Sequence, residues 1–209
     1  DFQHFTSDDG EEFELHPDQV LGAGAQGTVY RGTRLSTGES VAIKVIPTWR
    51  LILDDRGEEK LAAISQEMEM LKALGQHPGI AGMICGVDLY RDGVDSKFPQ
   101  FKVIVMEAVE GRELAEHVAL GGPMKESLAR HVILQILEAL GHVHGKHVIH
   151  RDLKPENVLV TGDDITLDSK VKLIDFGVAK CLTNGPMQTV VGTPLIMAPE
   201  VARAKISHV

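Results

Sequence analysis

The sequence predicts an α+β protein with two lobes, because strand-like and helix-like patterns occupy different halves of the chain. Short β-type runs dominate the first half, where Val41, Ile43 and Val45 alternate with other residues as in a half-buried strand. A long amphipathic helix pattern, 128–143, opens the second half. Runs of strands followed by helices are typical of α+β folds. We expect 107–111 to connect the two parts.

The separate elements follow from apolar spacing. The strand candidates are two glycine-interrupted pieces within 20–30 and the runs 39–46, 84–89, 101–107, 158–160 and 171–174. The helix 58–74 has apolar residues at Leu61, Ile64, Met68, Leu71 and Leu74, and the helix 128–143 has them at Leu128, Val132, Ile136, Leu140 and Val143. We expect Gly75 to end the first helix and a polar hairpin at 92–100. We expect Gly111, Gly121, Gly122 and Pro123 to interrupt helices and strands. We expect 1–12 to be an acidic leader.

The composition excludes several classes of protein. With 209 residues, 43% of them hydrophobic and 24% charged, the chain can bury a substantial core. A net charge of -9 argues against non-specific nucleic-acid binding, and no apolar run approaches membrane-spanning length. Cys85 and Cys181 form no disulfide framework, so we expect a reducing compartment and a cytoplasmic location, with the nucleus left open. Because the first residue is Asp1, we expect an excerpt from a longer chain.

Two polar segments in the second half supply groups that phosphate chemistry requires. They are His150-Arg151-Asp152-Leu153-Lys154-Pro155-Glu156-Asn157 and Asp175-Phe176-Gly177. Together they offer a carboxylate that can steer a hydroxyl, then an amide and a second carboxylate that can hold magnesium. Phosphoryl transfer depends on such positioning and charge neutralisation.

A glycine-rich segment in the first half is suited to binding phosphate. Gly22, Gly24 and Gly27 fit the pattern G-x-G-x-x-G-x-V, in which backbone N–H groups can approach phosphate oxygens without a Cβ in the way. Alone the motif is weak: an ordinary glycine-rich turn also explains it, and a dinucleotide-binding fold places the same glycines at the start of a helix. Here Val29 and Tyr30 continue as strand, which favours a hairpin.

These motifs, with Val41-Ala42-Ile43-Lys44 and Ala198-Pro199-Glu200, resemble the signatures of eukaryotic-type protein kinases. The resemblance covers 13–204. It implies a bilobal fold with a β-rich N-lobe carrying one major helix at 13–107 and a mainly helical, incomplete C-lobe at 108–209. The catalytic loop looks like that of calcium/calmodulin-dependent kinases, but we find no calmodulin-binding helix.

The resemblance implies catalytic roles for four residues of the second half, and also for Lys44 and Glu67 in the first half. Asp152 resembles the catalytic base, Lys154 the lysine that screens the transferred phosphate in serine/threonine kinases, and Asn157 and Asp175 the magnesium ligands. His150 and Phe176 are better explained as core packing that joins the lobes.

Lys44 is implied to meet ATP phosphate and a helix glutamate. Glu67 fits the family's helix pattern, whereas Glu69, the competitor, should point to a different face. Lys44 alone would more simply be an edge-strand lysine in solvent, and only the downstream motifs reverse that interpretation.

The resemblance also implies a nucleotide pocket. Its residues are the phosphate-binding Gly22, Gly24 and Gly27, the adenine-slot residues Leu21, Val29, Ala42 and Leu159, the gatekeeper Met106, and Glu107 and Val109, whose backbones would bind the adenine edge. The apolar members are in part plain core, because pocket walls are mostly apolar.

The stretch 175–200 resembles an activation segment. Thr193, in Gly192-Thr193-Pro194, is implied to brace Asp152 and Lys154. Thr189 is at a common phosphorylation position, where an upstream kinase could add a phosphate that pairs with Arg151; an unmodified surface threonine is an equal alternative.

The expected function is an ATP- and Mg²⁺-dependent protein kinase that phosphorylates Ser/Thr hydroxyls of protein substrates. A non-catalytic nucleotide-binding or scaffold module is the rival. A small-molecule kinase fits less well, because G-T-P and A-P-E are peptide-docking features.

The cluster of His142, His144 and His147 lacks a Cys or acid to complete a zinc site. Positive side chains of this kind suit the C-terminus of a helix.

Overall fold

The computed structural model describes residues 3–24, 27–52, 56–90, 98–177, 179–181, 193, 197 and 199. The chain divides into two compact units. The first comprises Asp1–Gly75 and Ala81–Val109, and the second comprises Gln76–Ile80 and Glu110–Val209. None of the helices in the described part of the chain has the length and hydrophobicity needed to cross a bilayer.

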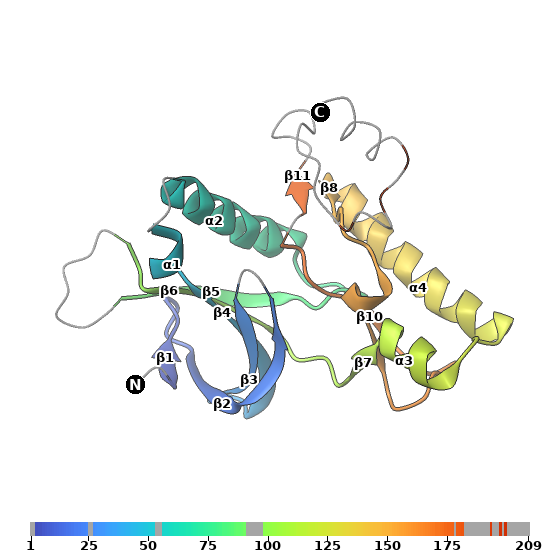
Figure 1. The fold of residues 1–209 in the computed structure, drawn as a ribbon. Coiled ribbons are helices and arrows are strands. Elements are labelled where there is room, and N and C mark those ends of the chain that lie inside the picture. Colours follow the sequence, from blue (N-terminus) through green and yellow to red (C-terminus); the bar gives the residue numbers. More distant parts are fainter. Residues whose placement is uncertain are drawn as a thin grey trace. The chain divides into compact units, whose positions relative to one another are not determined.

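The first unit is built on a six-stranded antiparallel sheet with the order β1-β2-β3-β4-β6-β5 (Figure 1). The strands are β1 His4–Thr6, β2 Glu12–Ala23, β3 Thr28–Arg34, β4 Glu39–Pro47, β5 Met83–Leu89 and β6 Phe101–Glu107. One core cluster contains Phe5, Phe13, Leu15, Val41, Ile43, Val45, Val87, Val103 and Val105. The alternating positions of β4 therefore point one set of side chains into this core and leave Lys44 on the opposite face.

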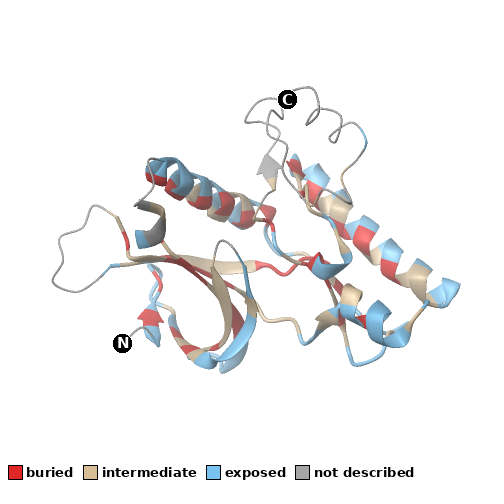
Figure 2. Ribbon diagram, in the orientation of Figure 1, coloured by how far each residue is buried: buried red, intermediate tan, exposed pale blue. Residues whose placement is uncertain are grey.

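Helix α2, Gly57–Leu74, packs on the sheet at β5 and carries the apolar spacing predicted from the sequence (Figure 2). Its buried positions are Gly57, Leu61, Ile64, Glu67, Leu71 and Leu74. Gly75 ends the helix with φ 67°, a conformation that glycine adopts without steric cost. A short helix, α1 Trp49–Ile52, precedes α2.

Part of the segment 1–12, which the sequence suggests as an acidic leader, forms a strand of the sheet. His4–Thr6 forms β1 and pairs with Glu12–Glu14 of β2. The cause is tertiary: Phe5 is buried and its ring stacks on Phe13 with centroids 5.6 Å apart. A three-residue strand whose single apolar residue needs a distant partner gives no pattern that a sequence window can detect.

Within the residues that the structure describes, the second unit contains two small sheets and the helices α3 and α4. Its elements are β7 Gly111–Glu113, α3 Leu114–Gly121, α4 Glu126–Gly145, β8 Val148–Ile149, the 3₁₀ turn Pro155–Asn157, β9 Val158–Thr161, β10 Val171–Leu173 and β11 Lys180–Cys181. The sheets have the orders β10-β9-β7 and β11-β8. Helix α4 packs against β10 through a face that includes Val132, Ile136, Ala139 and Val143, all buried.

The structure confirms the α+β class but divides the chain differently from a single boundary after residue 107. The first unit extends to Val109, and Gln76–Ile80 belongs to the second unit although it lies between α2 and β5 in sequence. The reason is a backbone contact: Leu173 N–H donates to the Gly79 carbonyl (2.8 Å), and Ile80 forms a parallel bridge with Leu173. The hairpin expected at 92–100 lies largely outside the described residues.

Candidate phosphoryl-transfer site

The carboxylate of Asp152 lies in a loop between β8 and the 3₁₀ turn, and each of its oxygens accepts two hydrogen bonds. Oδ1 accepts from the backbone N–H of Thr193 (2.9 Å) and from its hydroxyl (2.7 Å). Oδ2 accepts from Lys154 Nζ (2.9 Å) and Asn157 Nδ2 (3.1 Å). Lys154 Nζ also donates to Thr193 Oγ1 (3.2 Å), so Thr193 contacts both residues that the sequence analysis expected it to brace. The carboxylate is thereby held in one orientation.

These contacts keep Asp152 ionised. Partial burial alone would raise the pKa of its carboxyl, but hydrogen bonds from Lys154 and Thr193 outweigh that effect and hold the pKa below its ordinary value. The same carboxylate raises the pKa of Lys154, which therefore stays a cation. The loop thus presents a fixed negative charge beside a fixed positive charge.

Asn157 is buried and links this loop to the segment that leads to Asp175. Its Nδ2 donates to the Asp152 carbonyl (2.8 Å) as well as to Oδ2, and its own carbonyl accepts from Ile174 N–H (3.0 Å). Because Nδ2 is engaged, the remaining side-chain atom, Oδ1, is the one suited to a cation. Amide and carboxylate oxygens are the hard ligands that magnesium prefers, so Asn157 and Asp175 form a donor set that fits it.

Asp175 is exposed and adopts a left-handed backbone with φ 57°. Its Oδ1 accepts from Gly177 N–H (3.2 Å), a local bond that a short acidic side chain forms readily. Arg151 is also left-handed, with φ 65°. Such residues in an uncommon conformation are concentrated where function requires it.

A buried aromatic pair contacts the two segments that carry Asp152 and Asp175 through hydrogen bonds of His150. His150 and Phe176 pack with ring centroids 4.7 Å apart and are 2% and 3% exposed. His150 Nε2 donates to the Ile174 carbonyl (3.1 Å), and its Nδ1 accepts from Asp152 N–H (3.4 Å). Burial lowers the pKa of His150, which favours the neutral ring that these bonds require. The prediction that the pair is core packing is confirmed for the second unit.

The first unit holds the predicted lysine–glutamate pair. Lys44 Nζ lies 3.4 Å from Glu67 Oε1, and the two side chains are 12% and 8% exposed. The interpretation of Lys44 as an edge lysine in solvent is therefore wrong, since β4 lies between β3 and β6. Glu69 is exposed, on a different face of α2 from Glu67, as expected.

The glycine-rich segment forms the turn between β2 and β3. Gly24 and Gly27 exchange backbone hydrogen bonds of 2.9 and 3.3 Å, so the segment is a hairpin and does not open a helix. A Cβ at Gly27 would clash with the backbone of Val45, whereas Gly22 and Gly24 have open space around them. The hairpin therefore leaves open space at Gly22 and Gly24 for a phosphate, although the Gly24 N–H already donates to the Gly27 carbonyl.

Strand pairing brings several predicted nucleotide-pocket residues together in the first unit. Val29 pairs with Lys44, and Ala42 pairs with Met106. Glu107 N–H donates to the Gly82 carbonyl (2.9 Å), so this group is not available to an adenine, and the expectation for Glu107 is restricted to its carbonyl. Leu21 and Val109 also belong to the first unit, and Leu159 lies in the second, on β9.

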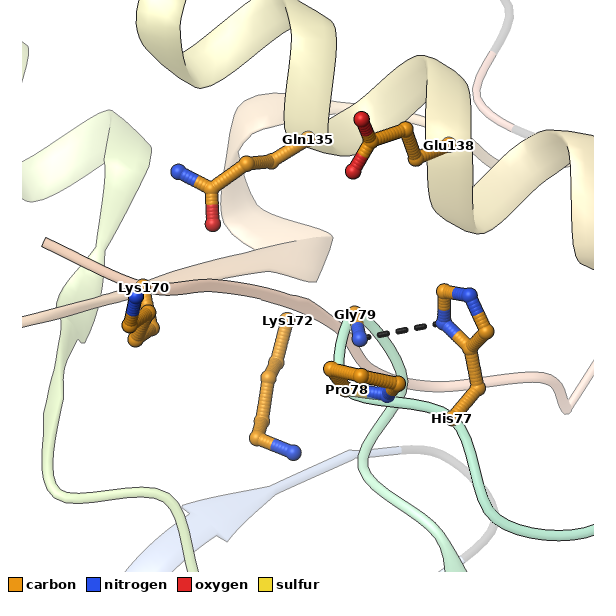
Figure 3. A pocket seen from close by; sticks show the side chains of 7 residues that line it. All are labelled: His77, Pro78, Gly79, Gln135, Glu138, Lys170 and Lys172. Atoms are coloured by element: carbon orange, nitrogen blue, oxygen red, sulfur yellow. Dashed lines mark hydrogen bonds between the residues drawn. The ribbon is translucent and has the colours of Figure 1, made fainter.

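A hollow in the second unit is separate from these predicted residues. It has a volume of about 340 Å³ and lies between α4, β10 and the segment 77–79 (Figure 3). Its lining residues are His77, Pro78, Gly79, Gln135, Glu138, Lys170 and Lys172. Sequence reasoning missed this feature because its members come from three separate stretches of the chain.

Much of the expected activation segment lies outside the described residues. Thr189 is among the residues not described, as are Gly192 and Pro194 on either side of Thr193.

Comparison with known proteins identifies the family of the chain. The protein kinase domain family matches residues 15–208. The chain is 36% identical over 192 residues to serine/threonine-protein kinase D2 of Homo sapiens and 37% identical over 193 residues to serine/threonine-protein kinase RAD53 of Saccharomyces cerevisiae. These alignments cover 90% and 92% of this chain, but only 20% and 21% of the relatives.

A third relative is calcium/calmodulin-dependent protein kinase type 1 of Caenorhabditis elegans, 38% identical over 187 residues that cover 89% of this chain and 49% of the relative. The chain belongs to the protein kinase family, and within it to the serine/threonine kinases. It spans about a fifth of the length of kinase D2 and about half of the type 1 kinase. Members of this family use ATP and magnesium ions.

Proposed function

We propose that this chain transfers the γ-phosphoryl group of ATP to serine and threonine hydroxyls of protein substrates. The observation that carries the proposal is the carboxylate of Asp152, which is ionised, oriented by Thr193 and Asn157, and paired with Lys154. A fixed carboxylate next to a fixed cation can accept a hydroxyl proton while the cation screens the transferred group.

The hydrogen bonds of Asp152 indicate which donor leaves when a substrate hydroxyl binds to its carboxylate. Each carboxylate oxygen accepts two hydrogen bonds, so a substrate hydroxyl that binds to Asp152 takes the place of one of the four donors. Lys154 is the donor that can leave, because its ammonium gains a stronger partner in a phosphate. Its departure opens Oδ2 to the hydroxyl, while Thr193 continues to hold Oδ1.

Magnesium, when bound with ATP, supplies neutralisation of phosphate charge and a fixed geometry for the γ-phosphate. In this proposal Asn157 Oδ1 and the Asp175 carboxylate hold the ions. Lys44, oriented by Glu67, binds phosphate oxygens, and the backbone of Gly22 and Gly24 covers them.

The adenine would lie against apolar side chains of the proposed pocket. These are Leu21, Val29, Ala42, Met106 and Leu159, with the Glu107 carbonyl and the Val109 backbone at the polar edge of the ring. We also propose that an upstream kinase can phosphorylate Thr189, whose phosphate would pair with Arg151.

The proposal is tested by phosphoryl transfer from radiolabelled ATP to a generic basic protein, followed by analysis of the labelled amino acid. We expect label on serine or threonine with the wild-type chain and a loss of at least about a hundredfold with Asp152→Asn. The matched control is Asp164→Asn, an exposed acid in the loop between β9 and β10, which should retain wild-type activity. Equal transfer by Asp152→Asn would refute the role of Asp152. ATP binding without any transfer by the wild-type chain would favour a nucleotide-binding module.

A further inference from the structure

Gln76–Ile80 is an unusual segment, because its two ends lead into one unit while its residues are fixed in the other. The chain leaves the first unit after Gly75, at the end of α2, and returns to it at Ala81, just before β5. Any change in how this segment is held therefore affects the chain that enters and leaves the first unit.

Hydrogen bonds to its backbone carbonyls hold the C-terminal part of the segment on the second unit. The Gly79 carbonyl accepts from Leu173 N–H (2.8 Å), and the Ile80 carbonyl accepts from Lys172 Nζ (3.4 Å). A Cβ at Gly79 would lie 2.9 Å from the Ala139 Cβ, so the absence of a side chain lets the segment approach α4 closely.

The N-terminal part of the segment is held by the ring of His77. This ring stacks on His142 of α4 with centroids 4.6 Å apart and an interplanar angle of 28°. Its Nδ1 accepts from Gly79 N–H (3.1 Å), as Figure 3 shows, and its carbonyl accepts from Ile80 N–H (3.1 Å). A protonated imidazole has no acceptor nitrogen, so this geometry requires a neutral His77.

The charges around His77 come from two elements packed against the segment. Burial is the largest cause that lowers the pKa of His77, and His142 and Lys172 lower it further, whereas Glu138 opposes them. Lys170, a second cation at the hollow, also lines the space that His77 faces. The ring is only half-buried, so a proton from solvent can reach it.

We propose that the stacked pair of His77 and His142 is a pH-sensitive clasp, which holds Gln76–Ile80 on the second unit at neutral pH and loosens it in mild acid. The clasp is the ring stack together with the Nδ1 bond to Gly79. Protonation breaks that bond and, when both rings are charged, makes the stack repulsive. The proposal concerns the local stability of the fold and does not depend on the phosphoryl-transfer activity.

The direction of the effect follows from proton linkage. Because the pKa of His77 lies below its ordinary value of 6.5 in the folded chain, the clasped state binds fewer protons than the open state. The contribution of the clasp is therefore complete above pH 6.5 and is lost as the pH falls below that value. One linked proton changes the opening equilibrium by at most about tenfold per pH unit.

Hydrogen exchange of the full chain between pH 7.5 and pH 5.5, corrected for the intrinsic rate, tests this proposal. We expect the protection of the backbone amides of Gly79, Ile80 and Leu173 to fall by about two- to tenfold per pH unit below pH 6.5. The amides of β4 should show no comparable change, which separates local loosening from acid unfolding.

Three variants identify the rings responsible. His77→Asn keeps an acceptor near the position of Nδ1, but this side chain cannot be protonated. In this variant the protection of the Gly79, Ile80 and Leu173 amides from hydrogen exchange should not vary with pH. His142→Phe keeps a ring in the stack without a second charge, so its pH dependence should be weaker than in the wild type. His144→Phe changes an exposed histidine in the same helix turn and should behave as the wild type.

Two results would overturn the proposal. One is wild-type protection of Gly79 and Ile80 that is constant from pH 7.5 to 5.5. The other, which does not depend on any variant folding, is an NMR titration of the wild-type chain in which the His77 ring has a pKa at or above 6.5.

Discussion

The bracing of Asp152 by Thr193 leads to the most specific prediction for catalysis. The substitution Thr193→Val replaces the hydroxyl with a methyl group of similar size. It removes the 2.7 Å bond from Thr193 Oγ1 to Asp152 Oδ1 and the 3.2 Å contact with Lys154, but it retains the 2.9 Å bond from the backbone N–H. The carboxylate then keeps its position less firmly.

The magnitude follows from the contacts that remain. A hydrogen bond to a charged group contributes about 1.5–3 kcal/mol. Asp152 is 13% exposed, so little water replaces the lost hydroxyl, but three other donors stay in place. We therefore take the lower limit, about 1.5 kcal/mol, which corresponds to roughly a tenfold fall in kcat. The KM for ATP should not change, because Thr193 is not among the residues proposed to bind the nucleotide.

The pH profile gives a second readout. The hydroxyl is one of the donors that hold the pKa of Asp152 below its ordinary value of 3.8. Its removal raises that pKa, so the acidic limb of kcat should move to higher pH. A merely structural role for Thr193 would lower activity without this shift.

Steady-state transfer from radiolabelled ATP measures both effects, with Thr193→Ser as the matched control. Serine keeps the hydroxyl and should stay within about twofold of the wild type, since both oxygen contacts can form. The reasoning is refuted if Thr193→Val retains wild-type kcat, or if Thr193→Ser loses as much as the valine variant.

Three further predictions test other parts of the account. Lys44→Met should abolish transfer while circular dichroism shows a folded chain, and unchanged turnover would count against a catalytic role for the Lys44–Glu67 pair. Asp175→Asn should remove the Mg²⁺-dependent part of ATP binding in calorimetry; a wild-type response to magnesium would exclude Asp175 as a ligand. Gly32→Ala should lower the free energy of unfolding, measured in urea, by about 1–3 kcal/mol, because the new Cβ would lie 2.6 Å from the Glu14 carbonyl oxygen. The matched control is Gly141→Ala, where a Cβ meets no other atom within 4 Å. This variant should not destabilise the chain.

Local patterns were sufficient to predict most elements of the first unit. The strand 101–107 is predicted with the bounds it has in the structure, and the helix 58–74 differs from α2 by one residue. Apolar spacing of 2 or 3.6 residues determines these elements, because one face of each is buried. Glu67, preferred over Glu69 because it fits the helix pattern of the family that the sequence resembles, lies among the buried positions of α2.

Elements that depend on a polar or distant contact could not be predicted. Helix α3 was missed because its buried residue is His117, whose ring nitrogen Nε2 lies 3.4 Å from the Val160 carbonyl, so no apolar periodicity marks it. The His77–His142 stack joins residues 65 positions apart in sequence, and neither has a local signal that would pair them. The position of His142 in the sequence indicates only the end of a helix.

The residues of the candidate site could be predicted from sequence motifs, but their geometry could not be predicted. Motifs identified Asp152, Lys154 and Asn157, but the saturation of both Asp152 oxygens depends on the fold of the loop and on Thr193, 41 residues away. The hydrogen bond from the Glu107 N–H to the Gly82 carbonyl likewise arises from the local backbone beside β5. Side-chain type is a property of sequence, whereas hydrogen-bond occupancy is a property of the folded chain.

The proposed function requires that Lys44 and the glycine hairpin bind the same nucleotide as Asn157 and Asp175. A titration with Mn²⁺·ATP, followed by NMR, tests this directly, because the paramagnetic ion broadens resonances of nearby residues. The account predicts that Gly22, Gly24 and Lys44 broaden with the same midpoint as Asn157 and Asp175. Broadening of one group alone, or of the two groups with different midpoints, would contradict it.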